Sequence, residues 1–102
     1  MRLLLAALIV LSLASPAWAG DAAVGHALAQ RWCASCHAVE PAASQVNDVA
    51  PSFDAIASTS GQNQAKLYAW LRAPHPAMPD FQLSRQNIDD IVTYIQSLRT
   101  QP

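Results

Sequence analysis

The clearest pattern of apolar and polar positions lies near the C-terminus. Apolar residues there repeat at i, i+3, i+4, i+7 and i+10, which is the spacing of one helix face. They are Ile88, Ile91, Val92, Ile95 and Leu98. The pattern predicts a helix from an N-cap at Ser84 to about Leu98. We interpret Asp89 and Asp90 as its solvated start, near the positive end of the helix dipole.

A second helix is predicted over Ala22–Ala34, with Asp21 as its N-cap. Its predicted apolar face consists of Val24, Ala27, Leu28 and Trp32. Gly25 interrupts this helix at a cost of about 1 kcal/mol relative to Ala. The position of this glycine therefore indicates a close contact with another helix.

The middle of the chain alternates between loops and shorter helices. Residues 39–50 hold proline, serine, asparagine and aspartate and predict a loop. Pro51–Ala57 predicts a short helix, and Gln62–Ala73 predicts a longer one. The apolar stripe of the longer helix consists of Leu67, Trp70 and Leu71. Three prolines predict a stiff extended loop over residues 74–79. No segment has the pattern of a strand, so we predict an all-α fold.

The N-terminal segment has the three parts of a secretory signal peptide. Met1-Arg2 supplies the positive charge, residues 3–14 form an uncharged apolar run, and Ala17-Trp18-Ala19 matches a cleavage site. The apolar run is too short for the ~20 residues that span a bilayer. We therefore predict that residues 1–19 are cleaved and that residues 20–102 form one secreted domain.

Composition excludes some classes of partner. The net charge is −1, and basic residues form no run or patch, so nucleic acid is not an expected partner. A chain of 102 residues provides at most one small domain, whose apolar core is thin. Domains of this size usually need a disulfide, a metal or a bound cofactor for stability.

Both cysteines lie in the segment Cys33-Ala34-Ser35-Cys36-His37, and C-x-x-C-H is the attachment signature of c-type haem. Each thiol can add to one vinyl group of haem, and His37 can then bind the iron as proximal ligand. We therefore predict one covalently bound haem c. A disulfide between these cysteines would close only a tiny loop, and a thioredoxin-type pair expects a βαβ context.

The second axial position of the iron needs another donor, and three residues could supply it. Met78 is the only methionine left without Met1, and Pro79 favours extended backbone at Met78. We predict Met78 as the ligand, because the prolines at 74, 76 and 79 stiffen its loop, which can then hold a weak iron–sulfur bond. The alternative for Met78 is a flexible core filler. His75 is a rival that we expect to point to solvent, and His26 is expected on the surface.

These motifs occur in a characteristic order. C-A-S-C-H is followed by A-P-S-F, P-H-P-A-M-P-D-F-x-L-S and I-D-D-I-V-T-Y-I-Q-S-L. The chain resembles small bacterial class I cytochromes c over nearly all of residues 20–102. The resemblance implies a class I cytochrome c fold, with three to five helices wrapped around one haem. It also implies that Gly25 contacts Ile91 and Tyr94 where the terminal helices cross, and that Met78 is the distal ligand.

The resemblance further implies that the carbonyl of Pro51 accepts the Nδ1–H of the haem-bound histidine. The alternative for this proline is an ordinary first residue of a helix. Trp70 and Tyr68 either bond a haem propionate or pack against the macrocycle. We interpret Phe53 and Phe81 as walls of the haem pocket.

We expect a carrier of single electrons between redox proteins, not an enzyme. With both axial positions filled, no small-molecule substrate reaches the iron. The chain is expected to be monomeric or loosely associated with a complex. One alternative is a dedicated electron-transfer subunit of a larger dehydrogenase or oxidase complex. Another is a haem sensor or gas-binding protein in which Met78 is a labile ligand.

Overall fold

The computed structural model describes residues 20–41, 49–73, 75 and 77–99. Over these ranges it has four helices, which are α1 (Ala22–Trp32), α2 (Phe53–Ala57), α3 (Gln64–Arg72) and α4 (Arg85–Ser97). The same ranges contain no strand, only an isolated bridge between His75 and Met78. The all-α prediction is confirmed. The predicted signal peptide, most of the predicted loop over 39–50, and two positions of the predicted loop over 74–79 lie outside the described residues.

Each helix begins where a polar side chain accepts a hydrogen bond from the backbone of its first turn. The four capping residues are Asp21, Ser52, Asn63 and Ser84. Such caps satisfy N–H groups that have no partner inside the helix. The caps predicted at Asp21 and Ser84 are confirmed. Helices α2 and α3 begin later than predicted because Ser52 and Asn63 are the residues that cap them.

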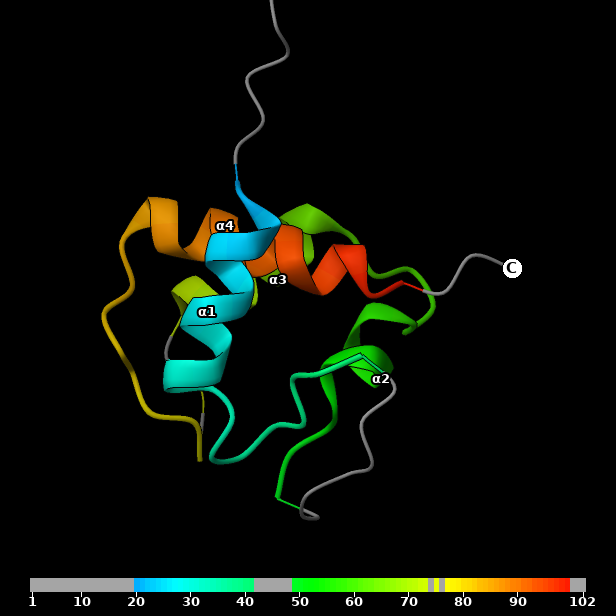
Figure 1. The fold of residues 1–102 in the computed structure, drawn as a ribbon, viewed down its shortest axis with the longest axis horizontal. Coiled ribbons are helices and arrows are strands. Elements are labelled where there is room, and N and C mark those ends of the chain that lie inside the picture. The colour runs from blue at the N-terminus through cyan, green and yellow to red at the C-terminus, as the bar shows by residue number, and fades with distance from the viewer. Residues whose placement is uncertain (1–19, 42–48, 74, 76, 100–102) are drawn as a thin grey trace, which may run out of the picture.

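Helices α1 and α4 cross closely at the centre of the fold (Figure 1). A Cβ atom built on Gly25 would lie 1.9 Å from the backbone oxygen of Asp90 and 3.0 Å from the backbone nitrogen of Ile91. Only glycine permits the two backbones to approach this closely. The close helix contact predicted for Gly25 is therefore confirmed, and its nearest partners are backbone atoms of Asp90 and Ile91.

The face that α1 buries carries smaller side chains than predicted. Val24 and Ala27 are exposed, whereas Ala29 and the glycine of this helix are buried. Small side chains occupy the crossing because larger ones would hold the helix axes apart. Leu28 and Trp32 pack at the edge of the core. The predicted apolar face is therefore right for Leu28 and Trp32 and wrong for Val24 and Ala27.

Asp90 is buried, which corrects the prediction that it forms a solvated helix start. It is only 4% exposed, and its Oδ1 accepts hydrogen bonds from the backbone N–H of Asp21 and from Nε2 of Gln86, both at 2.8 Å. These bonds offset the cost of taking the carboxylate out of water. Asp90 therefore ties the start of α1 to α4, while the neighbouring Asp89 is half-buried.

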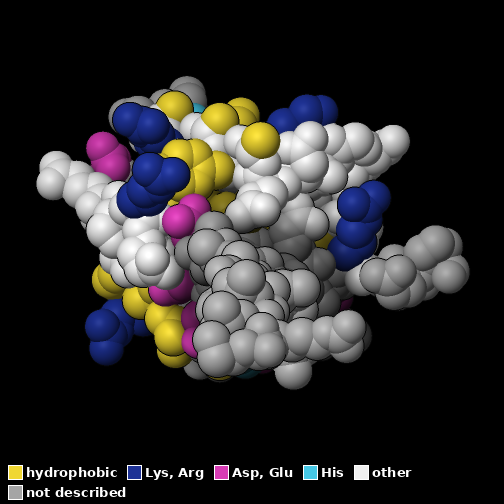
Figure 2. Space-filling model, turned by 90° about the horizontal axis from the view of Figure 1, so that it is seen from above, with side chains coloured by type: hydrophobic (Ala, Val, Ile, Leu, Met, Phe, Trp, Pro, Cys, Tyr) yellow, Lys and Arg dark blue, Asp and Glu magenta, His cyan; other side chains and the backbone are white. Residues whose placement is uncertain are grey.

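Helices α2 and α3 also pack on α4, so α4 contacts all the other helices. Its buried residues include Ile88, Ile91, Val92 and Ile95, as its periodicity predicted. Figure 2 shows Lys and Arg side chains at separate places on one face, in agreement with the absence of a basic run in the sequence. Within the described part of the chain, no helix has the length and apolar character needed to cross a membrane.

Gly25→Ala is expected to lower the free energy of unfolding by about 1–3 kcal/mol, because the added methyl group meets backbone and not a movable side chain. Guanidinium unfolding of the purified protein measures the effect. Ala27→Ser, on the exposed side of the same helix, should change the value by less than about 0.5 kcal/mol. An unchanged unfolding midpoint for Gly25→Ala would contradict the close crossing.

Candidate functional site

The segment that holds both cysteines forms a tight turn at the end of α1. Cys33 is the C-cap of this helix, and its carbonyl accepts hydrogen bonds from the N–H groups of Cys36 at 3.2 Å and His37 at 2.9 Å. The turn thus carries the two sulfur atoms and the imidazole in one compact unit. Both cysteines are free thiols, Cys33 buried and Cys36 half-buried. Burial raises the pKa of the Cys33 thiol to about 11.

His37 is oriented by the segment before α2. Its Nδ1 lies 2.6 Å from the backbone oxygen of Pro51. A carbonyl oxygen only accepts hydrogen bonds, so Nδ1 carries the proton and the neutral ring keeps a lone pair on Nε2. That is the arrangement of a metal-binding histidine whose other nitrogen is held by the protein. The structure therefore brings together the histidine and the proline carbonyl that the resemblance had paired.

A cavity of about 460 Å³ opens beside this turn. Its volume lies within the roughly 300–1,000 Å³ typical of sites for small molecules and cofactors. The residues around it are mainly apolar, and they come from the C-x-x-C-H turn, α2, α3 and the loop before α4. Cys33, Cys36 and His37 line it together with Met78 and His75. The predicted thiols and both predicted iron ligands therefore face one apolar cavity.

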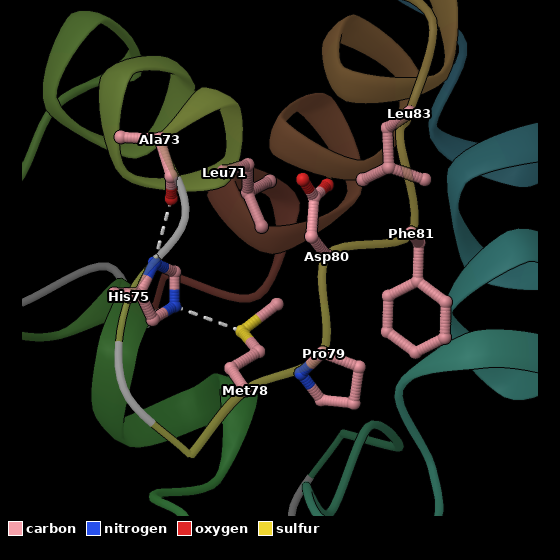
Figure 3. A pocket seen from close by; sticks show the side chains of 8 residues that line it. All are labelled: Leu71, Ala73, His75, Met78, Pro79, Asp80, Phe81 and Leu83. Carbon is pink, nitrogen blue, oxygen red and sulfur yellow. Dashed lines mark hydrogen bonds between the residues drawn. The ribbon is translucent and has the colours of Figure 1, made fainter.

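Met78 and His75 also line a smaller neighbouring pocket, where they contact each other (Figure 3). Nε2 of His75 lies 3.0 Å from Sδ of Met78, and both residues are half-buried. The other ring nitrogen, Nδ1, lies 2.9 Å from the backbone oxygen of Ala73. The prediction that His75 points to solvent is therefore wrong, because the backbone oxygen of Ala73 and the sulfur of Met78 orient its ring.

Two residues with left-handed backbone delimit the segment that presents Met78. Ala77, which precedes it, has a φ of 69°, and Gln82 has a φ of 51°. Residues with a Cβ atom rarely adopt this region, at a cost of about 1–2 kcal/mol. The antiparallel bridge between His75 and Met78 spans the first of these positions. The loop is therefore held in a specific turn in addition to being stiffened by proline.

The aromatic residues predicted around the site divide into two groups. Trp70 and Phe81 line the cavity, and Trp70 remains 62% exposed. Phe53 is buried behind His37, with 5.4 Å between ring centroids, and is not among the residues that line the cavity. Tyr68 packs against the core. The wall predicted for Phe81 is confirmed, whereas Phe53 supports the imidazole from behind.

A cluster around Glu40 closes the loop that follows the C-x-x-C-H turn, and we call it the Glu40 clasp. Both carboxylate oxygens lie within 2.9 Å of Nε2 of His26, and Nε2 of Gln30 donates to Oε1 at 2.7 Å. The ring of His26 stacks on Tyr94 at 4.5 Å, and the hydroxyl of Tyr94 donates to the backbone oxygen of Val39 at 2.5 Å. The clasp holds this loop against α1 and α4.

Sequence reasoning did not find the clasp. His26 was expected to be a simple surface residue, and the structure leaves it partly exposed but paired. Its partner Glu40 lies 14 residues further on. The spacing of four between His26 and Gln30 on α1 is the only local signal, since such residues share a helix face.

Comparisons with known proteins agree with this geometry. The family model described as cytochrome C oxidase, cbb3-type, subunit III matches residues 20–95. Cytochrome c-552 of Bradyrhizobium diazoefficiens is 46% identical over 92 residues, which cover 90% of this chain and 88% of the relative. No solved structure matches the chain significantly.

The helical fold and the cavity with its two thiols define the class as a small bacterial c-type cytochrome, an electron carrier with covalent haem c. Within that class, the chain belongs to the family of cytochrome C oxidase, cbb3-type, subunit III.

The residues on the cavity fit haem c. Cys33 and Cys36 are free thiols at its edge, as covalent attachment requires. His37 offers an Nε2 lone pair because Pro51 holds its Nδ1–H. The mainly apolar lining suits a porphyrin ring and would shield that ring from water.

The Glu40 clasp is expected to make stability depend on acidic pH. Hydrogen bonds from Gln30, and then from His26, hold the pKa of Glu40 below its ordinary value of about 4.5. A pKa lowered by folding contributes stability above the unfolded-state value, and this contribution is lost as pH falls through the folded-state value. Thermal unfolding of Glu40→Gln at a series of pH values should show a smaller loss of stability below about pH 4.5.

The matched control for this experiment is Asp80→Asn, which removes an exposed acid outside the clasp. It should leave the contribution of Glu40 in place. A Glu40→Gln protein with the same acid limb as the unsubstituted protein would contradict a stabilising clasp.

Proposed function

We propose that this protein shuttles single electrons between redox proteins of the bacterial periplasm, with His37 and Met78 as the axial ligands of its haem. The observation that carries the proposal is that one cavity is lined by both thiols, by His37 and by Met78. The thiols anchor the cofactor at its edge. The two ligand side chains come from segments far apart in the chain and meet at the same space.

The haem supplies one-electron chemistry when bound, and the protein sets the conditions for it. Pro51 orients His37 and makes it a stronger donor. The neutral thioether of Met78 favours the reduced state and raises the potential. If His37 and Met78 both hold the iron, no position would be left on it for a small-molecule substrate, as expected of a carrier rather than an enzyme.

Partners would meet the protein where the cavity opens to its surface. Trp70 and Phe81 line the cavity and remain 62% and 40% exposed, so they offer an apolar contact beside the cofactor. The net charge of −1 gives little long-range attraction to a charged partner. We therefore propose weak, short-lived contacts with donor and acceptor proteins, and a chain that is monomeric between them.

A dedicated subunit of an oxidase complex is the second candidate, because the family description names an oxidase subunit. The chain also matches 88% of the length of a protein named only as a cytochrome, cytochrome c-552, so we keep the free carrier as the first candidate. Fractionation of native cells distinguishes the two functions. A free carrier appears in the periplasmic extract, whereas a dedicated subunit remains with a membrane complex.

Mass spectrometry of the protein from periplasm is expected to give the mass of residues 20–102 plus one haem. The double variant Cys33→Ser/Cys36→Ser removes both attachment points and should yield protein without covalent haem. A haem mass that persists in the double variant, or retention of residues 1–19 in periplasmic material, would contradict the corresponding part of the proposal.

Met78→Ala is expected to abolish the weak red-edge absorption band that reports iron–sulfur ligation in the oxidised protein. The reduction potential should fall by on the order of 0.1 V, because axial-ligand identity spans about 0.8 V among haem proteins. Visible spectra and redox titration measure the two effects. Phe81→Leu keeps an apolar wall and should retain the band. An unchanged band and potential in Met78→Ala would remove Met78 from the iron.

A further inference from the structure

His75 has the same local arrangement as the proximal histidine. The Nδ1 of His37 bonds the backbone oxygen of Pro51 at 2.6 Å, and the Nδ1 of His75 bonds the backbone oxygen of Ala73 at 2.9 Å. Both histidines line the same cavity. A backbone carbonyl on one ring nitrogen is the usual support for a histidine that binds metal through the other.

The bond to Ala73 determines what Nε2 of His75 can do. Because a carbonyl oxygen cannot donate, Nδ1 carries the proton, and Nε2 of the neutral ring presents a lone pair. Nε2 lies at a hydrogen-bond distance of 3.0 Å from the sulfur of Met78 (Figure 3). Nitrogen and sulfur can both bind iron, so two potential ligand atoms lie in contact at one side of the cavity.

We propose that His75 is a second distal ligand, which takes the sixth position of the iron when Met78 leaves it. The proposal rests on the proposed function, because it requires the haem and the role of Met78. Nε2 of His75 contributes its lone pair to the iron as the lone pair of Sδ is withdrawn. One iron–sulfur bond would break and one iron–nitrogen bond would form. The exchange consumes no electron, and any proton carried by Nε2 would be released to solvent.

The surroundings of His75 favour a small movement of its side chain over a large one. The ring of His75 is flanked by the indole of Trp70, with 4.4 Å between ring centroids. The antiparallel bridge places His75 and Met78 opposite each other in the backbone. Either donor can therefore reach the same position without a change in the fold. Replacement of a thioether by an imidazole lowers the reduction potential, so the two states would differ in their driving force for electron transfer.

The test uses the oxidised, haem-loaded protein in a buffer without imidazole, with electron paramagnetic resonance as the readout of spin state. Met78→Ala should lose the iron–sulfur band yet remain low-spin, with the signature of two imidazole ligands. Met78→Ala/His75→Ala should lose that low-spin signal and become high-spin. Met78→Leu, which keeps the apolar volume, gives a second background in which His75 can be removed.

Two controls exclude other donors of this chain. Met78→Ala/His26→Gln and Met78→Ala/Lys66→Gln remove the remaining histidine outside the C-x-x-C-H motif and the single lysine. Both should remain low-spin. High-spin iron in Met78→Ala and Met78→Leu, or low-spin iron that survives the loss of His75, would overturn the proposal.

Failure of the proposed function gives a different result. The unsubstituted protein would then lack the iron–sulfur band from the outset, because Met78 would not bind the iron. The variants that lack both Met78 and His75 are compared with those that lack Met78 alone, in which low-spin iron is expected. This comparison does not depend on the spectrum of the unsubstituted protein. The two ideas can therefore fail separately.

Discussion

The crossing of α1 over α4 is the contact on which the rest of the structure depends. It is possible only because Gly25 leaves room for the backbone of α4. Helix α1 ends at the turn that carries the two thiols, and α4 packs against every other helix. Through Tyr94, α4 also reaches the loop after that turn. The close contact between the backbones of α1 and α4 thus sets the position of the haem-binding turn relative to the opposite wall of the cavity.

Backbone carbonyls orient the two histidines that line this cavity. Pro51 and Ala73 each hold the Nδ1–H of a histidine and so leave Nε2 available. A backbone carbonyl can take this role whichever side chain its residue carries. The role depends on where the backbone runs at Pro51, before α2, and at Ala73, after α3. The chemistry of the imidazoles is in this sense a property of the fold.

The helices could be predicted from the sequence because their signals are local. The periodicity of α4 and the capping residues Asp21 and Ser84 each act within a few residues. The C-x-x-C-H motif and Met78 were likewise visible as residue types in a characteristic order, and the pairing of His37 with Pro51 came from the family resemblance. Those parts of the site required no knowledge of distant contacts.

The features that sequence reasoning missed all depend on contacts between distant segments. Asp90 looked like a solvated residue at a helix start, and its burial follows from the start of α1, whose backbone donates to its carboxylate. The direction of His75 is set by the carbonyl of Ala73 and the sulfur of Met78, which a pattern of residue types does not reveal. The partners in the Glu40 clasp are brought together only by the packing of the loop on α1.

The left-handed residues Ala77 and Gln82 have a consequence for how this loop can evolve. Glycine would relieve the local backbone energy at either position, yet it would also give the unfolded loop more conformations to lose. We therefore expect two screens of one mutant library to rank replacements at these two positions differently. One screen scores resistance to heat, and the other scores the colour of the cofactor. The native residues thus accept a less favourable backbone conformation and restrict the conformations of the unfolded loop.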